Sequence, residues 1–121
     1  MKVIAINGSP RRDKGLTFKV LSNILSGATN AGAKGTYLHL IDENPQYCIH
    51  CGHDCFDELD CIQEESATNR SRTLEEYDAV ILGAPVYVWQ PSGLTAAFFD
   101  KLRLRTGSWR KPQPNGKLSM R

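Results

Sequence analysis

The chain has 121 residues, of which 40% are hydrophobic and 23% are charged, a composition typical of one globular domain rather than of a disordered tail. Its longest apolar run, residues 79–84, is far shorter than the roughly 20 residues of a membrane-spanning helix. The apolar run at residues 3–6 is too short for a signal peptide, and no cleavage site follows it. We therefore expect a cytoplasmic protein with no membrane partner.

Charge is unevenly distributed along the chain, although the formal net charge is only +2. Residues 42–65 hold eight carboxylates and no Lys or Arg, whereas residues 101–121 hold seven basic residues and no acid. The basic stretch lacks the interleaved aromatic side chains of a platform for single-stranded nucleic acid. We expect it to be a solvated face and expect no nucleic-acid partner.

Hydrophobic periodicity predicts strands that alternate with helices. Residues 3–6 form a continuous apolar run, which is typical of a strand buried on both faces. An amphipathic helix is expected from Leu16 to about Asn30. Its predicted apolar side consists of Leu16, Val20, Leu21, Ile24, Leu25 and Ala28.

The rest of the chain continues this alternation. Further strands are predicted at residues 36–41 and 79–83, and a short helix at residues 73–77 leads into the second of them. Ser92 is expected to cap a last helix, whose apolar row is Leu94, Phe98 and Leu102. Strand–helix–strand order with buried strands implies parallel crossovers and hence an α/β layered fold. Three strands are few for this architecture, and residues 105–121 add no convincing element.

The loop between the first strand and the first helix carries the chemistry of a phosphate site. A helix N-terminus offers free N–H groups and the positive end of the helix dipole to an anion. Ser9 and Thr17 add hydroxyl donors, and Arg11 and Arg12 add guanidinium charge. The loop matches neither a P-loop nor the Gly-x-Gly-x-x-Gly dinucleotide fingerprint.

A second loop, at residues 84–93, follows the strand at 79–83. In an open parallel sheet, ligands bind at the carboxyl ends of two neighbouring strands whose following connections run to opposite faces of the sheet. This loop is therefore expected to face the phosphate loop. Its small and proline-bounded backbone allows a planar ring to approach, and Tyr87 or Trp89 can cover one face of that ring. Tyr87 and Trp89 can equally serve as core or interface aromatics.

Two separated segments resemble the NADPH-dependent FMN reductase family. They are residues 3–12, Val-Ile-Ala-Ile-Asn-Gly-Ser-Pro-Arg-Arg, and residues 76–88, Glu-Tyr-Asp-Ala-Val-Ile-Leu-Gly-Ala-Pro-Val-Tyr-Val. Residues 91–102 continue the likeness, which covers most of residues 1–104. The cysteines at residues 48–61 resemble those of the iron–sulfur flavoprotein branch.

The resemblance implies a flavodoxin-like three-layer fold and bound FMN. The phosphate would lie at Ser9, Arg11, Arg12 and Thr17, and the flavin ring against Pro85, Val86, Tyr87 and Val88. It also implies a homodimer or homotetramer, with NAD(P)H or a ferredoxin as electron donor. Residues 1–121 would form one partial domain with a cysteine-rich loop at 45–65, truncated before the fourth and fifth strands. Unlike its relatives, the chain is polar rather than apolar at residues 64–72.

Four cysteines, Cys48, Cys51, Cys55 and Cys61, fall within one short segment. In a cytoplasmic chain such crowding indicates a metal or redox site before a disulfide framework. Four thiolates can hold a [4Fe–4S] cluster, which the resemblance implies, although its usual middle spacing is one residue shorter. Zinc, with His50 or His53 replacing a sulfur, and cysteines that bind nothing are the alternatives.

We therefore predict an FMN-binding oxidoreductase in which the flavin carries out the chemistry and the cysteine loop passes single electrons. No acid–base or nucleophilic residue is assigned a catalytic role. One alternative is an NAD(P)H-dependent FMN or quinone reductase without a cluster. Another is an incomplete or structural domain that binds no flavin.

Overall fold

A computed structural model describes residues 1–52, 55 and 60–106 of the chain. Its centre is a parallel sheet in the order β2-β1-β3, formed by β1 (Lys2–Asn7), β2 (Lys34–His39) and β3 (Ala79–Gly83). Ile4 of β1 pairs with Thr36 on one side and with Val80 on the other. The predicted flavodoxin-like α/β fold is thereby confirmed in its strand order and direction.

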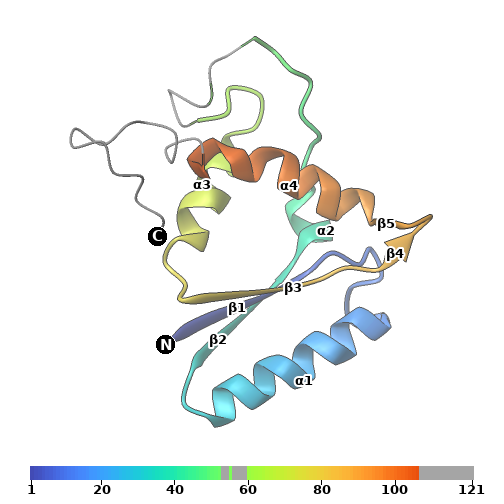
Figure 1. Ribbon diagram of the computed structural model, residues 1–121, viewed down its shortest axis with the longest axis vertical. Helices are drawn as coiled ribbons and strands as arrows, with labels where there is room; N and C mark the ends of the chain where they lie inside the picture. Colours follow the sequence, from blue (N-terminus) through green and yellow to red (C-terminus); the bar gives the residue numbers. More distant parts are fainter. Residues whose placement is uncertain (53–54, 56–59, 107–121) are drawn as a thin grey trace.

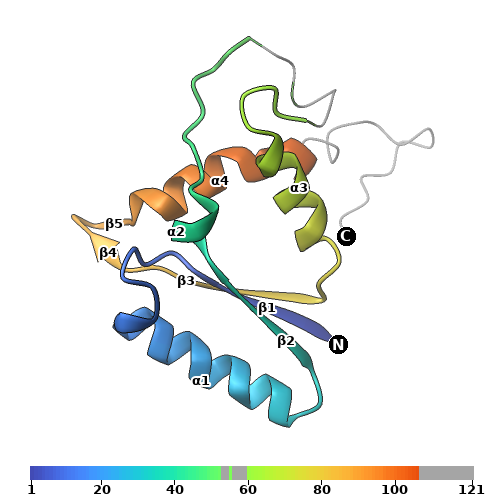
Figure 2. The same cartoon turned by 180° about the vertical axis from the view of Figure 1, so that it is seen from behind.

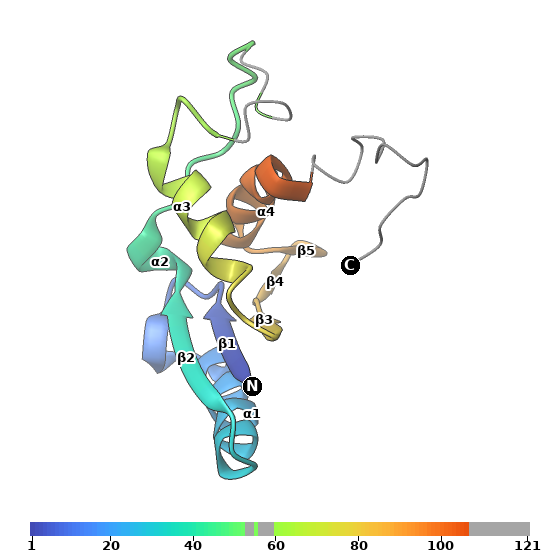
Figure 3. The ribbon, with the colours of Figure 1, turned by 90° about the vertical axis from the view of Figure 1, so that its left-hand side faces the viewer.

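Helices cover both faces of the sheet and make three layers (Figures 1 and 3). Helix α1 (Leu16–Asn30) lies on one face, and α3 (Glu65–Leu74) and α4 (Gly93–Thr106) lie on the other. The short α2 (Leu40–Glu43) continues directly from β2, and a 3₁₀ turn, η1 (Arg12–Lys14), precedes α1. None of the helices within the described ranges combines the length and apolar character needed to cross a membrane.

The main core lies between the sheet and α4. Ile4, Ile6, Leu40 and Phe98 are buried there, with exposed fractions of 3% or less. Burial of each such side chain contributes about 1.5–3 kcal/mol to folding. Partly buried neighbours complete this core: Leu38, Leu74, Tyr77, Leu94 and Leu102.

On the opposite face, α1 approaches β3 closely. A Cβ at Gly83 would lie 2.8 Å from Leu21 Cδ1, so a larger residue there would displace the Leu21 side chain. Leu21 is buried, whereas Leu16, Val20 and Ile24 are 76%, 50% and 46% exposed. The expectation that these three belong to the buried side is therefore wrong, because the sheet reaches only the Leu21 side of the helix.

Two predicted elements have different bounds in the structure. The second strand ends at His39, and Ile41 belongs to α2 rather than to the strand. The helix expected at residues 73–77 begins at Glu65 and ends at Leu74. Hydrophobic periodicity did not predict the first part of this helix, because its buried residues are small or polar: Ala67, Thr68, Arg70 and Ser71.

The chain from β3 to α4 contains a hairpin that periodicity did not predict. Strands β4 (Val86–Tyr87) and β5 (Gln90–Pro91) pair antiparallel. The two turn residues, Val88 and Trp89, have φ angles of 49° and 65°. The left-handed region is unfavourable for large and β-branched residues, so this tight turn holds backbone strain.

Candidate functional site

The loops that leave β1 and β3 meet at the carboxyl ends of these neighbouring strands. The Gly8 N–H donates to the Gly83 carbonyl at 2.7 Å. The Ser92 hydroxyl donates to the Gly8 carbonyl at 2.5 Å. Ser92 also bonds to Thr95 in the first turn of α4, and a Cβ at Gly8 would overlap the Thr95 hydroxyl. Glycine is therefore required where the two loops touch.

Asn7 organises the first loop from inside the protein. It is fully buried, and its Oδ1 accepts the Ser9 N–H at 2.9 Å. Its Nδ2 donates to the Arg12 carbonyl at 3.1 Å and lies 3.3 Å from His39 Nδ1. Sequence reasoning treated Asn7 only as a turn residue. Its position at the end of an apolar strand could have indicated its role, because a side-chain amide that is buried there needs hydrogen-bond partners.

The N-terminus of α1 fits an anion. Gly15 is the N-cap and makes no side-chain capping bond, and the first turn contains no acidic residue. The amide groups of this turn and the positive end of the helix dipole are thus left to an external acceptor. Thr17 is half-buried in the same turn. These features match the phosphate of FMN in charge and hydrogen-bonding chemistry.

The three other predicted phosphate residues have different surroundings. Ser9 is buried, and its hydroxyl accepts the Arg11 N–H at 3.3 Å. The Arg11 side chain is exposed. Arg12 forms an ion pair with Asp42 at the end of α2, so its charge is already partly neutralised. Of the two guanidinium groups, Arg11 is therefore the better candidate for a phosphate contact.

The predicted ring contacts lie at the β4–β5 hairpin. Pro85 is half-buried and its carbonyl accepts the Ser92 N–H at 3.1 Å. Val86, Tyr87 and Val88 are 72%, 48% and 90% exposed, and the neighbouring Trp89 is 96% exposed. The hairpin and the first loop lie at the same end of the sheet (Figures 1 and 2). Exposed apolar groups beside an anion site suit a ligand with a charged tail and a flat apolar head.

The four cysteines belong to the segment between α2 and α3. The parts of this segment that the structure describes lie on the opposite side of the sheet from α1 (Figure 2). All four thiols are free; Cys48 and Cys51 are exposed, and Cys55 and Cys61 are half-buried. Burial raises the pKa of the Cys55 thiol, and charge repulsion between it and the other three cysteines raises it further. Among residues 1–52, 55 and 60–106, no three potential ligands are grouped closely enough to hold a metal ion.

The donor chemistry of this segment therefore fits an iron–sulfur cluster or zinc, but the described thiols do not form a ready ligand cage. His50 is exposed with a φ of 51°, and His53 lies outside the described residues. The described residues of the cysteine segment therefore do not provide a set of zinc ligands.

The base of the cysteine segment holds a buried group of charges that sequence reasoning missed. Glu64 bonds to Arg70 at 2.5 Å and to Lys101 at 2.7 Å, and all three side chains are at least nine-tenths buried. Burial alone would raise the pKa of Glu64, but hydrogen bonds from Lys101 and Arg70 outweigh burial and lower it to about 2. Glu64 is thus firmly ionised at neutral pH.

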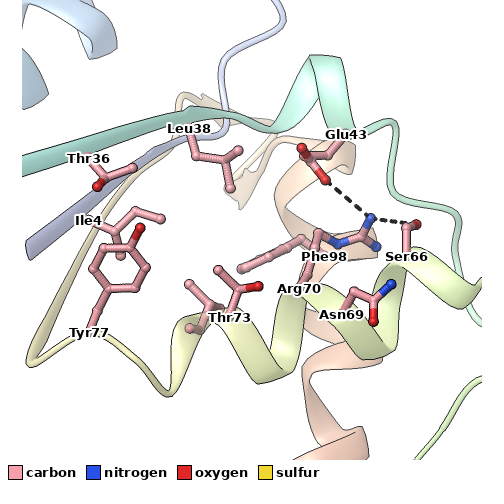
Figure 4. A pocket seen from close by; sticks show the side chains of 11 residues that line it. Ile4, Thr36, Leu38, Glu43, Ser66, Asn69, Arg70, Thr73, Tyr77 and Phe98 are labelled. Atoms are coloured by element: carbon pink, nitrogen blue, oxygen red, sulfur yellow. Dashed lines mark hydrogen bonds and ion pairs between the residues drawn. The ribbon is translucent and has the colours of Figure 1, made fainter.

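A cavity of about 300 Å³ lies between α3 and the sheet. Figure 4 shows Arg70 at one end of it, joined to Glu43 and Ser66, and Tyr77 at the other. Small polar side chains of α3 face the apolar floor made by Ile4 and Leu38 and leave the space unfilled. The cavity is separate from the two loops at the strand ends.

A parallel sheet with a candidate anion site and an exposed apolar hairpin at the carboxyl ends of β1 and β3 is typical of a flavodoxin-like protein with a candidate mononucleotide site. The model of the NADPH-dependent FMN reductase family matches residues 1–120, and the chain belongs to this family.

Several curated proteins resemble the chain. An iron-sulfur flavoprotein of Archaeoglobus fulgidus is 33% identical over 102 residues, which are 84% of this chain and 46% of that protein. An iron-sulfur flavoprotein of Methanocaldococcus jannaschii is 32% identical over 88% of this chain and 55% of its own length. The chain thus spans about half the length of the curated relatives it matches.

The crystal structure of an azoreductase from Bacillus anthracis superposes with a TM-score of 0.72. The match covers 96% of this chain and 61% of that chain, at 20% sequence identity. This likeness supports the fold.

Proposed function

We propose that this chain is the flavin-binding part of an FMN-dependent oxidoreductase that also carries a [4Fe–4S] cluster on Cys48, Cys51, Cys55 and Cys61. Residues 1–121 then act as a flavodoxin-like FMN-binding domain with a cysteine-rich loop at 45–65. The observation that carries the proposal is the meeting of the two loops through Gly8, Gly83 and Ser92 at the ends of β1 and β3.

In this proposal the first loop binds the phosphate. The uncapped first turn of α1, the hydroxyls of Ser9 and Thr17 and the Arg11 guanidinium donate hydrogen bonds to it. Arg12 contributes indirectly, because its ion pair with Asp42 ties the loop to α2. Asn7 keeps the loop in this shape through its bonds to Ser9 and Arg12.

The second loop supplies the surface for the flavin ring. Pro85, Val86, Tyr87 and Val88 offer apolar contact area, and the hairpin turn limits how far they can move. FMN, when bound, supplies hydride and single-electron transfer that no side chain of this chain can provide. NAD(P)H or a ferredoxin is the proposed electron donor, and a homodimer or homotetramer is the proposed assembly.

The Arg11→Ala substitution tests the phosphate site. We expect FMN affinity to fall about tenfold or more while riboflavin affinity changes little, because only FMN carries the phosphate. Fluorescence titration of both flavins measures this. Arg72→Ala, which removes an exposed arginine from α3, is the matched control. Equal losses for both flavins would contradict the assignment, and failure of the wild type to retain either flavin would favour a domain that binds none.

A second candidate is an NAD(P)H-dependent FMN or quinone reductase without a cluster. It is favoured by the lack of a metal-ligand group among the described residues. Anaerobic purification followed by iron, sulfide, zinc and flavin analysis separates the candidates. Iron and sulfide together with a broad absorption shoulder near ~400 nm would support the cluster. Flavin without any metal would support the second candidate.

A further inference from the structure

The end of β2 contacts the organising residue of the first loop through one histidine. His39 is the last residue of β2 and is half-buried. It is the register partner of Asn7 at the end of β1, and its Nδ1 lies 3.3 Å from Asn7 Nδ2. This contact joins β2 to the loop in which we place the phosphate of FMN.

The hydrogen bonds of Asn7 determine which way its amide group points. Its Oδ1 accepts the Ser9 N–H at 2.9 Å, and its Nδ2 donates to the Arg12 carbonyl at 3.1 Å. Turning the amide by half a rotation would set oxygen against oxygen and N–H against N–H, so both of these bonds would be lost. Nδ2 therefore faces His39. An amide nitrogen has two N–H donors and no acceptor, so its second N–H is directed to His39 Nδ1.

This direction fixes the protonation state of His39. An imidazole nitrogen accepts a hydrogen bond only when it carries no proton. His39 is thus neutral in this arrangement, with its proton on Nε2. A protonated His39 would carry an N–H at both nitrogens, and its Nδ1–H would face an N–H of Asn7 across 3.3 Å. Either the His39 ring or the amide of Asn7 must then move.

Aromatic neighbours hold the His39 ring. Phe18 of the first turn of α1 stacks on it, with ring centroids 5.9 Å apart and ring planes inclined by 19°. Tyr37 of β2 lies on it with a centroid distance of 5.0 Å, and Phe18 and Tyr37 contact each other edge to face at 5.2 Å. Movement of the His39 ring would break these aromatic contacts.

The first loop is the part of this junction that gives way more easily. Arg12, whose carbonyl Asn7 holds, has a φ angle of 51°, which is unfavourable for a residue other than glycine. The bond from Asn7 helps to keep Arg12 in that conformation. The Ser9 hydroxyl in turn accepts the Arg11 N–H. Loss of the Asn7 bonds therefore displaces Ser9 and Arg11, two of the residues that we place at the phosphate.

We propose that His39 is a positioning residue for phosphate binding: its neutral imidazole holds the first loop, through Asn7, in the shape that accepts the FMN phosphate, and its protonation releases that loop. This inference rests on the proposed FMN site. Imidazole is the side chain whose charge ordinarily changes between pH 5 and pH 8. Phosphate binding should therefore weaken as the pH falls and His39 gains a proton.

The other ionisable groups of this junction are Tyr37, Arg12 and Asp42. Arg12 and Asp42 form an ion pair with each other. Burial raises the pKa of the Tyr37 phenol above its ordinary value of 10, so Tyr37 stays neutral in mildly acidic solution. The contacts of His39 from α1 and β1, Phe18 and Asn7, carry no charge. A pH effect at this junction is thus assigned to His39.

His39→Asn tests the proposal, because asparagine can place an acceptor oxygen near the position of Nδ1 but does not gain a proton. His50→Asn, at an exposed histidine outside this junction, is the matched control. The measured quantity is the ratio of the FMN Kd at pH 5.5 to that at pH 8, from fluorescence titration. Because the FMN phosphate itself gains a proton at about pH 6, this ratio is compared between proteins.

We expect the Kd ratio to be about fivefold larger in the wild type and in His50→Asn than in His39→Asn. Riboflavin, which lacks the phosphate, should show no such difference. An equal ratio in the wild type and His39→Asn would overturn the proposal. So would a smaller ratio in the wild type, the result expected if the imidazolium only attracts the phosphate, and so would the same difference for riboflavin. If circular dichroism shows that His39→Asn does not fold, His39→Phe replaces it, since its ring keeps the packing on Phe18; its ratio should also be smaller than that of the wild type.

A second measurement does not depend on flavin binding. Nitrogen NMR of the wild type should show His39 with a proton on Nε2 and none on Nδ1 at pH 8. The signals of the Asn7 side-chain amide and the Ser9 N–H should then shift together with His39 protonation. If the wild type retains no FMN, the proposed function fails, and this measurement alone decides the inference. A proton on Nδ1 at pH 8, or Asn7 and Ser9 signals that do not follow His39, would overturn it.

Discussion

Two buried polar side chains, Asn7 and Glu64, decide the shape of the two candidate binding segments. Asn7 holds the phosphate loop through the Ser9 N–H and the Arg12 carbonyl. Glu64 holds the cysteine segment through Gln46, Arg70 and Lys101. Each makes bonds to several elements, and removal of one member of such a buried group leaves the others without compensation.

The lowered pKa of Glu64 makes stability depend on pH. Because its pKa is about 2 in the folded protein and 4.5 ordinarily, its contribution is complete above pH 4.5 and is lost as the pH falls toward 2. The contribution is at most about 3 kcal/mol. Besides Arg70 and Lys101, the charged group that faces this site is Glu43, across from Arg70.

Urea unfolding of the metal-free protein at a series of pH values checks this prediction. The difference in free energy of unfolding between the wild type and Glu64→Gln should be largest near neutral pH and should shrink below pH 4.5. A difference that stays constant down to pH 3 would show that the Glu64 charge does not stabilise the fold.

At the scale of elements, α3 is the unusual helix of the protein. Four of its ten residues are buried, and three of these four are polar. Thr68 and Arg70 have partners, but the buried Ser71 hydroxyl has none among the described residues. A buried hydroxyl without a partner destabilises the fold, and serine is a poorer helix former than alanine.

Ser71→Ala should therefore raise the free energy of unfolding, by about 1 kcal/mol. Ser26→Ala, at an exposed interior position of α1, is the control that reports helix propensity alone. Thermal or urea unfolding compares the two. A gain no larger than that of Ser26→Ala would mean that the Ser71 hydroxyl finds a partner, such as water.

At the scale of the whole molecule, β3 forms one of the two edges of the sheet, because within the described residues its only partner strand is β1. Val80 and Leu82 of this strand are 49% and 36% exposed. Open apolar edge strands promote pairing with other chains, and a charged residue on such a strand opposes it. The stripe of Leu16, Val20 and Ile24 exposes a second apolar surface on the other layer.

Val80→Lys should therefore reduce self-association of the 121-residue chain, as measured by light scattering across a concentration series. Ile24→Lys adds the same charge and removes a similar exposed side chain away from the strand edge. If Ile24→Lys has an equal effect, net charge or the α1 surface rather than the β3 edge controls association.

Hydrophobic periodicity was enough to predict the helices and strands whose apolar residues are regularly spaced. The helix that starts at Leu16 was predicted to end near Asn30 and Gly32, and it ends at Asn30; the strand from Ala79 to Gly83 was predicted at its observed bounds. The sequence of α3 has no such pattern, so only its final residues were predicted to be helical. The placement of FMN on Ser9, Arg11, Arg12, Thr17 and residues 85–88, and of metal on the cysteines, remains a prediction.

By itself the sequence predicted the three strands of the parallel sheet, the helices α1 and α4 and the family, and it supplied the residue types of the two loops and the cysteine segment, because these depend on residue type and spacing along the chain. The tertiary structure alone decided that Arg12 pairs with Asp42, that Asn7 lies between the first loop and His39 of β2, and that the Gln46 N–H bonds to Glu64. The reason is physical: a buried polar group needs partners, and residues far apart in the sequence supply them only after the chain has folded.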